Sequence, residues 1–518
     1  MKITVHDGAG VIGGTKILLH DTDTAVFLDF GINFFQKGLY FEEFLKPRVT
    51  RGLLDLLETG VIPPLKGLYR PDLEVPGLWE RFSPTILGKI DGVLLTHAHL
   101  DHSGHISLLR EDIPIVTRLI TAVMAKAVQD SVQSDFEREV CYITLRVMEG
   151  GVLKALKGAP SLGRPLRIIE EGGPASDISL KNVEGFFRRI PMKSKGLDAQ
   201  PIVIADKVGN LPVKAFPVDH SIFGATAYAV ETSSGWVVYT GDLRRHGKMR
   251  NFTESFVSEA SRIHPKVLLV EGTNTEFSEP VTEESVGERC LGVVKKAKGL
   301  VVADFGPRNL ERLLTFLDIA RDTRRSLVVT AKDIYIMDSL APLVPEIQEA
   351  LEDERLVIYR EARASITGWE EEMYTKYEGH LVTTGHIAEN SGAFILCFSF
   401  WDFNELIDIN PHGGTYVYST SEAFDEEQRI DLKRWKQWLD HFHLEVHGFP
   451  DIETGKVTGE EKGFHASGHM SGEDILWLIE SINPEVVIPV HTEDPGFFQK
   501  HLKGKKVILP QKGISIEL

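Results

Sequence analysis

Short apolar runs that alternate with polar residues fill the first part of the chain, and Gly or Asp separates them: KITVHDG, GGTKILLHD and TAVFLDFG. A period of two is typical of strands with one buried face. Gly or Asp between such runs favours tight turns. We therefore expect a β-meander at the N-terminus, up to about residue 30.

Further strand-like runs follow an aromatic and proline-rich connection at 31–90: DGVLL, LPVKAFPVDHS, TAYAVETSSGWVVYTGD and KVLLVEGT. The stretch LITAVMAKAVQDSVQ, which comes after the first of these, has the spacing of an amphipathic helix. The segment 136–205 mixes helical pieces with a middle that contains Gly and Pro. We interpret this segment as an insertion.

Helical and strand-like runs alternate between about 280 and 455, for example LERLLTFLDIARD, SLVVTAK and AFILCFS. Such alternation is typical of a parallel sheet with crossover helices. The tail adds a helix, ILWLIESIN, and two strands, EVVIPVH and KVILP. The sequence has no run of about 18 uncharged apolar residues, so it predicts no membrane span.

The formal net charge of −18, over 518 residues, bears on the choice of substrate. A chain of this length is expected to form about three domains. A strongly acidic surface repels nucleic acid at long range, so a polyanion would have to be held by a local basic patch and by metal ions. The charge lowers the expectation of a nucleic-acid substrate without excluding one.

The three cysteines, Cys141, Cys290 and Cys397, are an odd number and lie far apart in the sequence. They exclude a disulfide framework and a cysteine zinc site, and they fit a reducing compartment. The N-terminus lacks the charged and then apolar organisation of a signal peptide. A cytoplasmic protein is therefore expected.

The segment HAHLDH directly follows the DGVLL strand and holds four metal-binding side chains: His97, His99, Asp101 and His102. Side chains two apart on an extended segment point the same way, so His97 and His99 can reach one ion. Asp101 and His102 follow where the strand must end, and they can face a second ion. Imidazole and carboxylate together suit zinc, manganese and similar divalent ions.

Three more candidate ligands each close an apolar run: His220 after KAFPVD, Asp242 after WVVYTG, and His491 after EVVIPV. Taken singly, a histidine at a strand end is usually a polar cap, and an aspartate after a glycine is usually a turn former. Their joint occurrence with HAHLDH is what favours a two-metal site.

Six motifs, in order along the chain, resemble those of the metallo-β-lactamase fold and its β-CASP branch of ribonuclease J-like nucleases: HAHLDH, VDHSIFGA, YTGDLRRHG, VLLVEGTNTEF, FHASGHMSGEDI and IPVHTEDP. The resemblance implies an α/β fold, namely an αββα metallo-β-lactamase sandwich with an inserted α/β β-CASP domain. The implied domains are 1–275 (first part of the sandwich, with the insertion near 136–205), 276–455 (β-CASP domain) and 456–518 (return segment that completes the sandwich).

The resemblance also implies two divalent metal ions, with zinc expected before manganese. Their ligands would be His97, His99 and His220 for one ion, Asp101, His102 and His491 for the other, and Asp242 as the bridge. Asp29, in VFLDFG, matches an aspartate that orients a ligand from behind. The alternative for Asp29 is a turn aspartate at a strand end.

The catalytic residues that the resemblance implies are Asp101, Asp242, Glu271 and His469. Glu271 matches the first β-CASP motif, and His469 matches the second, where it would position the phosphate or protonate the leaving oxygen. Contacts to the substrate phosphate are expected from His465, Ser467, Gly468, His469, Arg244 and Arg245.

Several of these positions have alternatives. His465 is otherwise a structural neighbour of His469, and Arg245 could pair with a surface carboxylate as readily as with phosphate. The same holds for Lys248 and Arg250 of the cluster LRRHGKMR. Arg308, in FGPRNLERL, is either a phosphate contact or a residue at a sheet edge.

Three features depart from the pattern of ribonuclease J. The interval 103–219 is longer than expected, little chain follows His491, and the acidic YSTSEAFDEEQ stands where relatives carry a serine-rich phosphate loop. We therefore expect no separate C-terminal domain. The preference for a 5′ end and the oligomeric state, with a homodimer as one arrangement, stay open.

The function expected from these residues is a metal-dependent phosphodiester hydrolase, a ribonuclease J-like exo- or endonuclease whose nucleophile is a hydroxide bridging two metals. Single-stranded RNA is the expected partner, and DNA is the second candidate. One alternative is a dimetal hydrolase of a small ester, thioester or lactone, against which Glu271 and His469 argue. The other is a non-catalytic RNA-processing scaffold, against which the complete ligand set argues.

Overall fold

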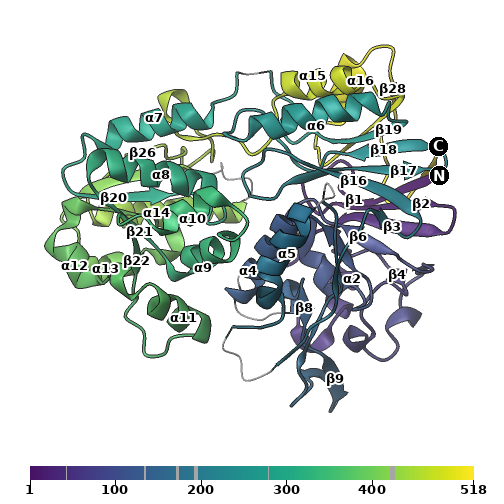
Figure 1. The fold of residues 1–518 in the computed structure, drawn as a ribbon, viewed down its shortest axis with the longest axis horizontal. Coiled ribbons are helices and arrows are strands. Elements are labelled where there is room, and N and C mark those ends of the chain that lie inside the picture. The colour runs from purple at the N-terminus through teal and green to yellow at the C-terminus, as the bar shows by residue number, and fades with distance from the viewer. Residues whose placement is uncertain (43, 133–135, 171–173, 192–195, 278, 421–425) are drawn as a thin grey trace.

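The computed structural model describes residues 1–42, 44–132, 136–170, 174–191, 196–277, 279–420 and 426–518. Two β-sheets stack on each other with helices outside them, and a third sheet with its own helices lies to one side (Figure 1). Parts of the predicted insertion at 136–205 and of the acidic segment at 418–428 lie outside the described residues.

The first sheet has eight strands in the order β14-β12-β7-β6-β3-β2-β1-β29. Their bounds are β1 (Lys2–Asp7), β2 (Lys16–Asp21), β3 (Thr24–Phe30), β6 (Gly92–Leu94), β7 (Ile115–Thr117), β12 (Leu166–Ile168), β14 (Ile202–Ile204) and β29 (Ser515–Glu517). β1, β2 and β3 form the predicted meander, with antiparallel pairing. β12 and β14 come from the predicted insertion and extend the sheet in parallel beyond β7.

The second sheet has seven strands in the order β15-β16-β17-β18-β19-β27-β28. Their bounds are β15 (Lys207–Val208), β16 (Leu211–Pro217), β17 (Thr226–Thr232), β18 (Gly235–Tyr239), β19 (Val267–Glu271), β27 (Val486–Val490) and β28 (Lys506–Val507). β27 pairs in parallel with β19, so the chain leaves this sheet after β19 and returns to it beside the same strand.

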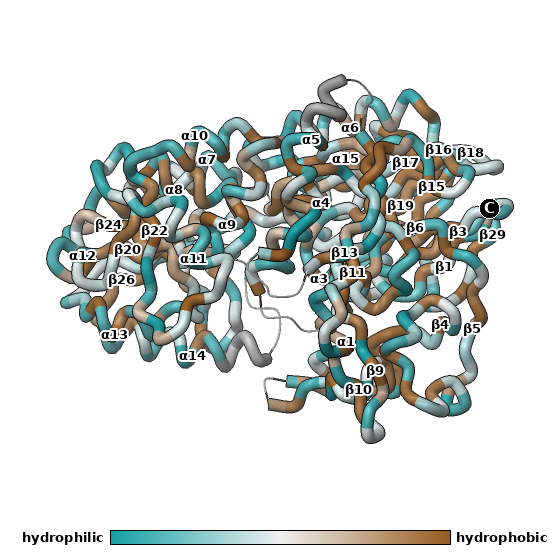
Figure 2. Tube along the Cα trace, turned by 60° about the horizontal axis from the view of Figure 1, so that its bottom comes forward, coloured by the Kyte–Doolittle hydropathy of each residue, from teal (hydrophilic) through white to brown (hydrophobic). Residues whose placement is uncertain are grey.

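Buried apolar side chains from both sheets form one core cluster between them. In Figure 2 the tube is brown, the colour of hydrophobic residues, along many strands of the sandwich. β16 illustrates why the sequence folds this way: Leu211, Val213 and Ala215 are buried in this core, while Pro212 and Lys214 between them are exposed. Each fully buried Val or Leu side chain contributes about 1.5–3 kcal/mol relative to an exposed one. The alternation therefore determines which face of the strand points inward.

Helices cover both outer faces of the sandwich. The second sheet is covered by α6 (Arg250–Arg262), α15 (Gly472–Ile482) and α16 (Gly496–His501), through side chains such as Phe256 and Ile479. The elements beside the first sheet include α1 (Phe34–Gly38), α2 (Leu54–Glu58), α3 (Leu100–Ser103), α4 (Leu119–Asp130) and α5 (Pro174–Phe187). Short strands complete this part: β4 (Leu65–Lys66), β5 (Thr85–Ile86), β8 (Tyr142–Ile143), β9 (Arg146–Glu149), β10 (Val152–Ala155), β11 (Ser161–Gly163) and β13 (Leu197–Asp198).

The third sheet is entirely parallel, in the order β23-β22-β21-β24-β20-β25-β26. Its strands are β20 (Leu300–Asp304), β21 (Ser326–Val329), β22 (Leu356–Tyr359), β23 (Leu381–Val382), β24 (Phe394–Leu396), β25 (Gly414–Tyr418) and β26 (Leu444–His447). The helices that connect them are α7 (Glu283–Val294), α8 (Leu310–Thr323), α9 (Ala331–Leu340), α10 (Pro345–Leu351), α11 (Gly368–Lys376), α12 (Thr384–Glu389), α13 (Glu405–Ile409) and α14 (Glu426–His441).

The predicted fold class is confirmed: a sandwich of two sheets between helices, with a parallel α/β unit inserted between β19 and β27. The domain limits at 275 and 455 stay a prediction. In the described part of the chain, every helix is too short or too polar to span a membrane.

Acid is expected to destabilise the sandwich through His6 of β1. Burial lowers the pKa of His6 to about 4, with a further contribution from Lys16, and its Nε2 atom has no hydrogen-bond partner among the described residues. An unfolded histidine takes up a proton near pH 6.5, so native stability falls as the pH drops from about 6.5 to 4, by at most about 1.4 kcal/mol per pH unit. Urea unfolding of His6→Phe and of the unaltered chain at several pH values measures this. Equal slopes for the two proteins would contradict it.

Candidate metal centre

The predicted ligands gather because they follow neighbouring strands. β18, β19 and β27 are parallel neighbours, so Asp242, Glu271 and His491 meet at one edge of the second sheet. β3 and β6 are parallel neighbours in the first sheet, which places Asp29 beside Thr96 and the HAHLDH segment. The two edges face each other across the sandwich.

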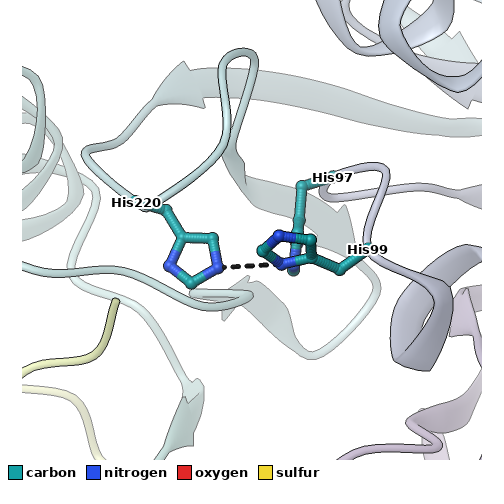
Figure 3. Close-up of side chains that lie close together, drawn as sticks. All are labelled: His97, His99 and His220. Atoms are coloured by element: carbon teal, nitrogen blue, oxygen red, sulfur yellow. Dashed lines mark hydrogen bonds between the residues drawn. The ribbon is translucent and has the colours of Figure 1, made fainter. Parts of the chain in front are cut away.

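His97, His99 and His220 form one group of nitrogen donors (Figure 3). The Nε2 atom of His97 lies 3.1 Å from Nδ1 of His99, and Nε2 of His220 lies 3.2 Å from that same atom. Burial lowers the pKa of His97 and His220 well below the ordinary value and that of His99 to about 4. All three imidazoles are therefore neutral at neutral pH and have lone pairs for a cation.

Hydrogen bonds fix which nitrogen of His97 and His220 is left free. Nδ1 of His220 donates to the carbonyl oxygen of Gly468 over 2.6 Å. The hydroxyl of Thr96 donates to Asp29, so it accepts from Nδ1 of His97, 3.0 Å away. In both residues Nε2 then carries the lone pair that points into the group.

Asp101, His102, Asp242 and His491 form the second group. Nε2 of His102 is 3.1 Å from Oδ2 of Asp242, and Nε2 of His491 is 3.3 Å from Oδ2 of Asp101. Asp242 also approaches the first group, since its Oδ2 is 3.8 Å from Nε2 of His97. Its carboxylate thus lies between the two groups, where a bridging ligand is expected.

The donor set fits divalent metal ions. Nε2 of His102 and Oδ1 of Asp242 are buried and have no hydrogen-bond partner among the described residues. Burial raises the pKa of Asp242, but the His102 and His491 imidazoles outweigh it and hold that pKa well below the ordinary value. A buried polar atom without a partner costs about 1–3 kcal/mol, a cost that a bound cation removes. Imidazole with carboxylate is the ligand chemistry of zinc and manganese.

Asp29 lies directly behind His102. Its Oδ2 atom accepts from Nδ1 of His102 at 2.7 Å and from the hydroxyls of Tyr239 and Thr96 at 2.8 and 2.7 Å. The carboxylate thereby turns Nε2 of His102 toward the second group. Asp29 and His491 both have left-handed backbones, with φ of 56° and 51°. Such strain, about 1–3 kcal/mol per residue, is a feature of sites whose geometry the surroundings impose.

Glu271, which is buried, pairs with the half-buried His469 beside Asp242. Oε2 of Glu271 is 2.8 Å from Nδ1 of His469, and Oε1 accepts from the backbone N–H of Leu243. Burial lowers the pKa of His469, but the Glu271 carboxylate outweighs it and raises the pKa to about 9. Together with Asp242 and His491, these two side chains also form a third group of potential ligands that overlaps the second.

Two other predicted phosphate contacts, Ser467 and His465, have different hydrogen-bond partners from each other. The hydroxyl of Ser467 accepts from the backbone N–H of His469. His465 lies instead at the edge of the third sheet, where its ring nitrogens contact the carbonyl oxygens of Thr420 and Gly448 at 2.5 and 2.6 Å. These contacts favour the alternative that the sequence left open, in which His465 is a structural residue.

The prediction that Arg244 contacts substrate is corrected by its burial. Its guanidinium is fully buried and pairs with Asp219, Glu283 and Glu311 at 3.1, 2.8 and 2.5 Å. Its N–H groups donate to these three carboxylates and to the carbonyl oxygen of Ser467, so they are directed into the protein and not toward a substrate. Proximity to Asp242 in the sequence suggested the wrong role, because the side chain of Arg244 is held by buried carboxylates.

The remaining basic residues of this cluster lie near the surface. Arg245 is partly exposed, pairs with Glu254 and Asp474, and lies over the Trp477 ring at 4.0 Å. Lys248 and Arg250 are exposed. These contacts favour the surface-pairing alternative for Arg245.

Sequence reasoning missed three hydroxyls that hold the ligands: Thr96, Tyr239 and Thr273. Thr273 lies 2.8 Å from Nδ1 of His491 through its Oγ1 atom. The signal was available in part, since Thr96 directly precedes His97 and Thr273 follows Glu271 by two residues. Tyr239 had no such signal. It lies on β18 of the second sheet, whereas Asp29 lies on β3 of the first sheet, and only the stacking of the two sheets brings them together.

A methyl group at Gly468 is expected to weaken metal binding by about 10- to 100-fold. An added Cβ would lie 3.0 Å from Cε1 of His220 and 2.9 Å from the hydroxyl oxygen of Ser221, so His220 would have to move. Chelator competition for zinc with the Gly468→Ala variant measures the change. Gly292→Ala is the matched control, because a Cβ there meets no atom within 4 Å. Equal zinc affinity of the two variants would argue against a role for His220.

Two family models match the chain. The model of the metallo-beta-lactamase superfamily matches residues 85–259, and that of the Zn-dependent metallo-hydrolase RNA specificity domain matches residues 460–510. The first range contains HAHLDH, His220 and Asp242, and the second contains His469 and His491. The two matches therefore hold the seven predicted ligands between them.

The chain is similar to several proteins named ribonuclease J. That of Helicobacter pylori (strain B128) is 21% identical over 498 residues, which are 95% of this chain and 56% of the relative. That of Mycolicibacterium smegmatis is 22% identical over 490 residues, 90% of this chain and 71% of the relative. That of Pyrococcus abyssi is 24% identical over 330 residues, 60% of this chain and 67% of the relative. The chain thus spans just over half the length of the Helicobacter relatives that it matches.

A solved structure shares the whole fold. The crystal structure of a protein of unknown function from Enterococcus faecalis V583 matches with a TM-score of 0.66 at 22% identity, over 100% of this chain and 99% of that chain. At this identity the likeness concerns the fold.

Proposed function

We propose that this chain, which has the metallo-β-lactamase fold and is similar to ribonuclease J, is a metal-dependent hydrolase of phosphodiester bonds in RNA. The observation that carries the proposal is the pair of adjacent donor groups with Asp242 between them. The match of residues 460–510 to an RNA specificity domain supports RNA as the substrate. The names of the relatives support the same class of reaction.

Two divalent ions held by these residues would supply an activated water and charge neutralisation at the phosphoryl group. We propose zinc before manganese, because histidine supplies most of the donors. The protein's own part is to orient them. Gly468, Thr96 and Asp29 each fix one imidazole, so that a free nitrogen points at the donor group.

His469 is the residue that we propose to act on the substrate itself. Its Nδ1 is held by Glu271, which leaves Nε2 to contact a phosphoryl oxygen. Because its pKa is raised to about 9, His469 is protonated at neutral pH and can donate to the phosphate or to the departing oxygen. Glu271 then acts through His469, as a positioning residue buried behind it.

We also propose that the protein is cytoplasmic. Its oligomeric state stays to be tested, and a homodimer is one candidate. The three cysteines are free, and Cys141 and Cys290 are buried, which is the usage expected in a reducing compartment.

The test of this proposal is a cleavage assay with the purified chain. Single-stranded RNA and DNA of the same sequence, each with a 5′-monophosphate, 5′-triphosphate or 5′-hydroxyl end, are incubated with added zinc or manganese. We expect cleavage of RNA, and the pattern of fragments distinguishes exonuclease from endonuclease action. Absence of cleavage in every arm, together with hydrolysis of a thioester or lactone, would overturn the proposal in favour of a small-ester hydrolase.

A further inference from the structure

Three cationic side chains near the metal centre have no ion-pair partner among the described residues: Arg138, Arg308 and Lys332. They come from different parts of the fold. Arg138 lies in η5 (Phe136–Arg138) beside the first sheet, Arg308 follows β20, and Lys332 lies in the first turn of α9. Most other basic side chains near the site, such as Arg244 and Arg245, are paired with carboxylates.

The fold brings Arg308 to the HAHLDH segment, and Arg138 and Lys332 lie close enough to Arg308 for their charges to interact. β20 and β21 both flank β24 in the parallel sheet, so Arg308 and Lys332 lie at the same carboxyl edge. Ligands of open α/β sheets bind at this edge. Nη1 of Arg308 donates to the carbonyl oxygen of Ala98 over 3.5 Å, which places the guanidinium against the backbone between His97 and His99.

No carboxylate of the described residues forms an ion pair with this cluster, although the charge of Asp101, a predicted metal ligand, acts on Arg308. Burial, and then repulsion from Arg138, lowers the pKa of Arg308 to about 10, so its guanidinium is still charged at neutral pH. Burial and the charge of Arg308 likewise lower the pKa of Lys332. The nearby Asp333 and Asp402 carboxylates are engaged as helix caps with Thr330 and Ser399.

We propose that Arg138, Arg308 and Lys332 bind a phosphate group of the substrate beside the metal centre. Arg138 is exposed and Arg308 and Lys332 are half-buried, so an anion can reach them. Guanidinium and ammonium groups are the preferred donors to phosphate. The proposal rests on the proposed function for the identity of the substrate. It also answers the objection of the net charge of −18, because a local cluster can hold a polyanion on an acidic protein.

The phosphate has two sources: an internal phosphodiester or a terminal 5′-monophosphate. The experiment measures binding of fluorescent single-stranded RNA to the full chain in chelator, with 5′-phosphate and 5′-hydroxyl arms, over a range of salt concentrations. Arg308→Gln and Lys332→Gln are each expected to weaken binding about tenfold and to lower the salt slope by about 0.7. Equal loss in both arms assigns an internal phosphate, and loss in the 5′-phosphate arm alone assigns the terminal one.

Arg321→Gln is the matched control, because Arg321 lies on α8 of the same unit and pairs with Asp318 and Asp353. Arg308→Lys keeps the charge and should retain most of the affinity. Melting temperatures check that each variant is folded. If Arg308→Gln and Lys332→Gln bind RNA as tightly as Arg321→Gln, the phosphate site is overturned. If binding is tight and depends on Arg308 and Lys332, but no RNA is cleaved under zinc or manganese, the proposed function is overturned and this site is left in place.

Discussion

Replacement of Asp242 by alanine is expected to lower RNA cleavage by about 10³-fold or more and to reduce the bound metal at the same time. The carboxylate lies 3.1 Å from Nε2 of His102 and 3.8 Å from Nε2 of His97, so it lies close to both donor groups. Its removal takes away the carboxylate between the two groups and leaves Asp101 beside His102 and His491 only.

Metal content by mass spectrometry and single-turnover cleavage of RNA measure the two effects on the same protein. Asp91→Ala is the matched control: Asp91 is a buried aspartate just before β6, where it accepts from the backbone N–H of Ala25. That variant should lose some stability but keep its metal. A fully active Asp242→Ala protein with an unchanged metal content would refute the shared role of this carboxylate.

The ligands could be predicted from the sequence because each of them ends an apolar run. Apolar runs become buried strands, and parallel neighbours such as β18, β19 and β27 must have their carboxyl ends at one edge. The polar residue that follows each strand, such as Asp242 or His491, is then brought to that edge. The same reasoning predicted the meander and the parallel sheet at 280–455.

Partners from distant segments of the chain could not be predicted in this way. Nothing in LRRHG distinguishes Arg244, which is fully buried, from Arg245, which is partly exposed, since that depends on Glu283 and Glu311 in a distant segment. β12 and β14 were also missed as parts of the first sheet. Each has three residues, too few to establish a period, and their place depends on pairing with β7 and with each other.

Arg244→Met is expected to lower the free energy of unfolding by about 3–5 kcal/mol. Arg244 and Arg312 lie among three carboxylates, Asp219, Glu283 and Glu311, all of them buried. Asp219 belongs to the sandwich, whereas Glu283 and Glu311 lie on α7 and α8 of the inserted unit. Without the Arg244 guanidinium, Arg312 is left as the single cation of the network, and Asp219 and Glu311 remain buried without an ion-pair partner.

Urea unfolding at neutral pH measures this loss, and Arg262→Met is the matched control. Arg262 is exposed on α6, where its pair with Glu259 is screened by water, so its removal should change stability by less than about 1 kcal/mol. Adding Glu311→Gln to Arg244→Met should restore part of the loss, because one buried charge is then removed. If Arg244→Met unfolds at the same urea concentration as Arg262→Met, this network does not hold the inserted unit to the sandwich.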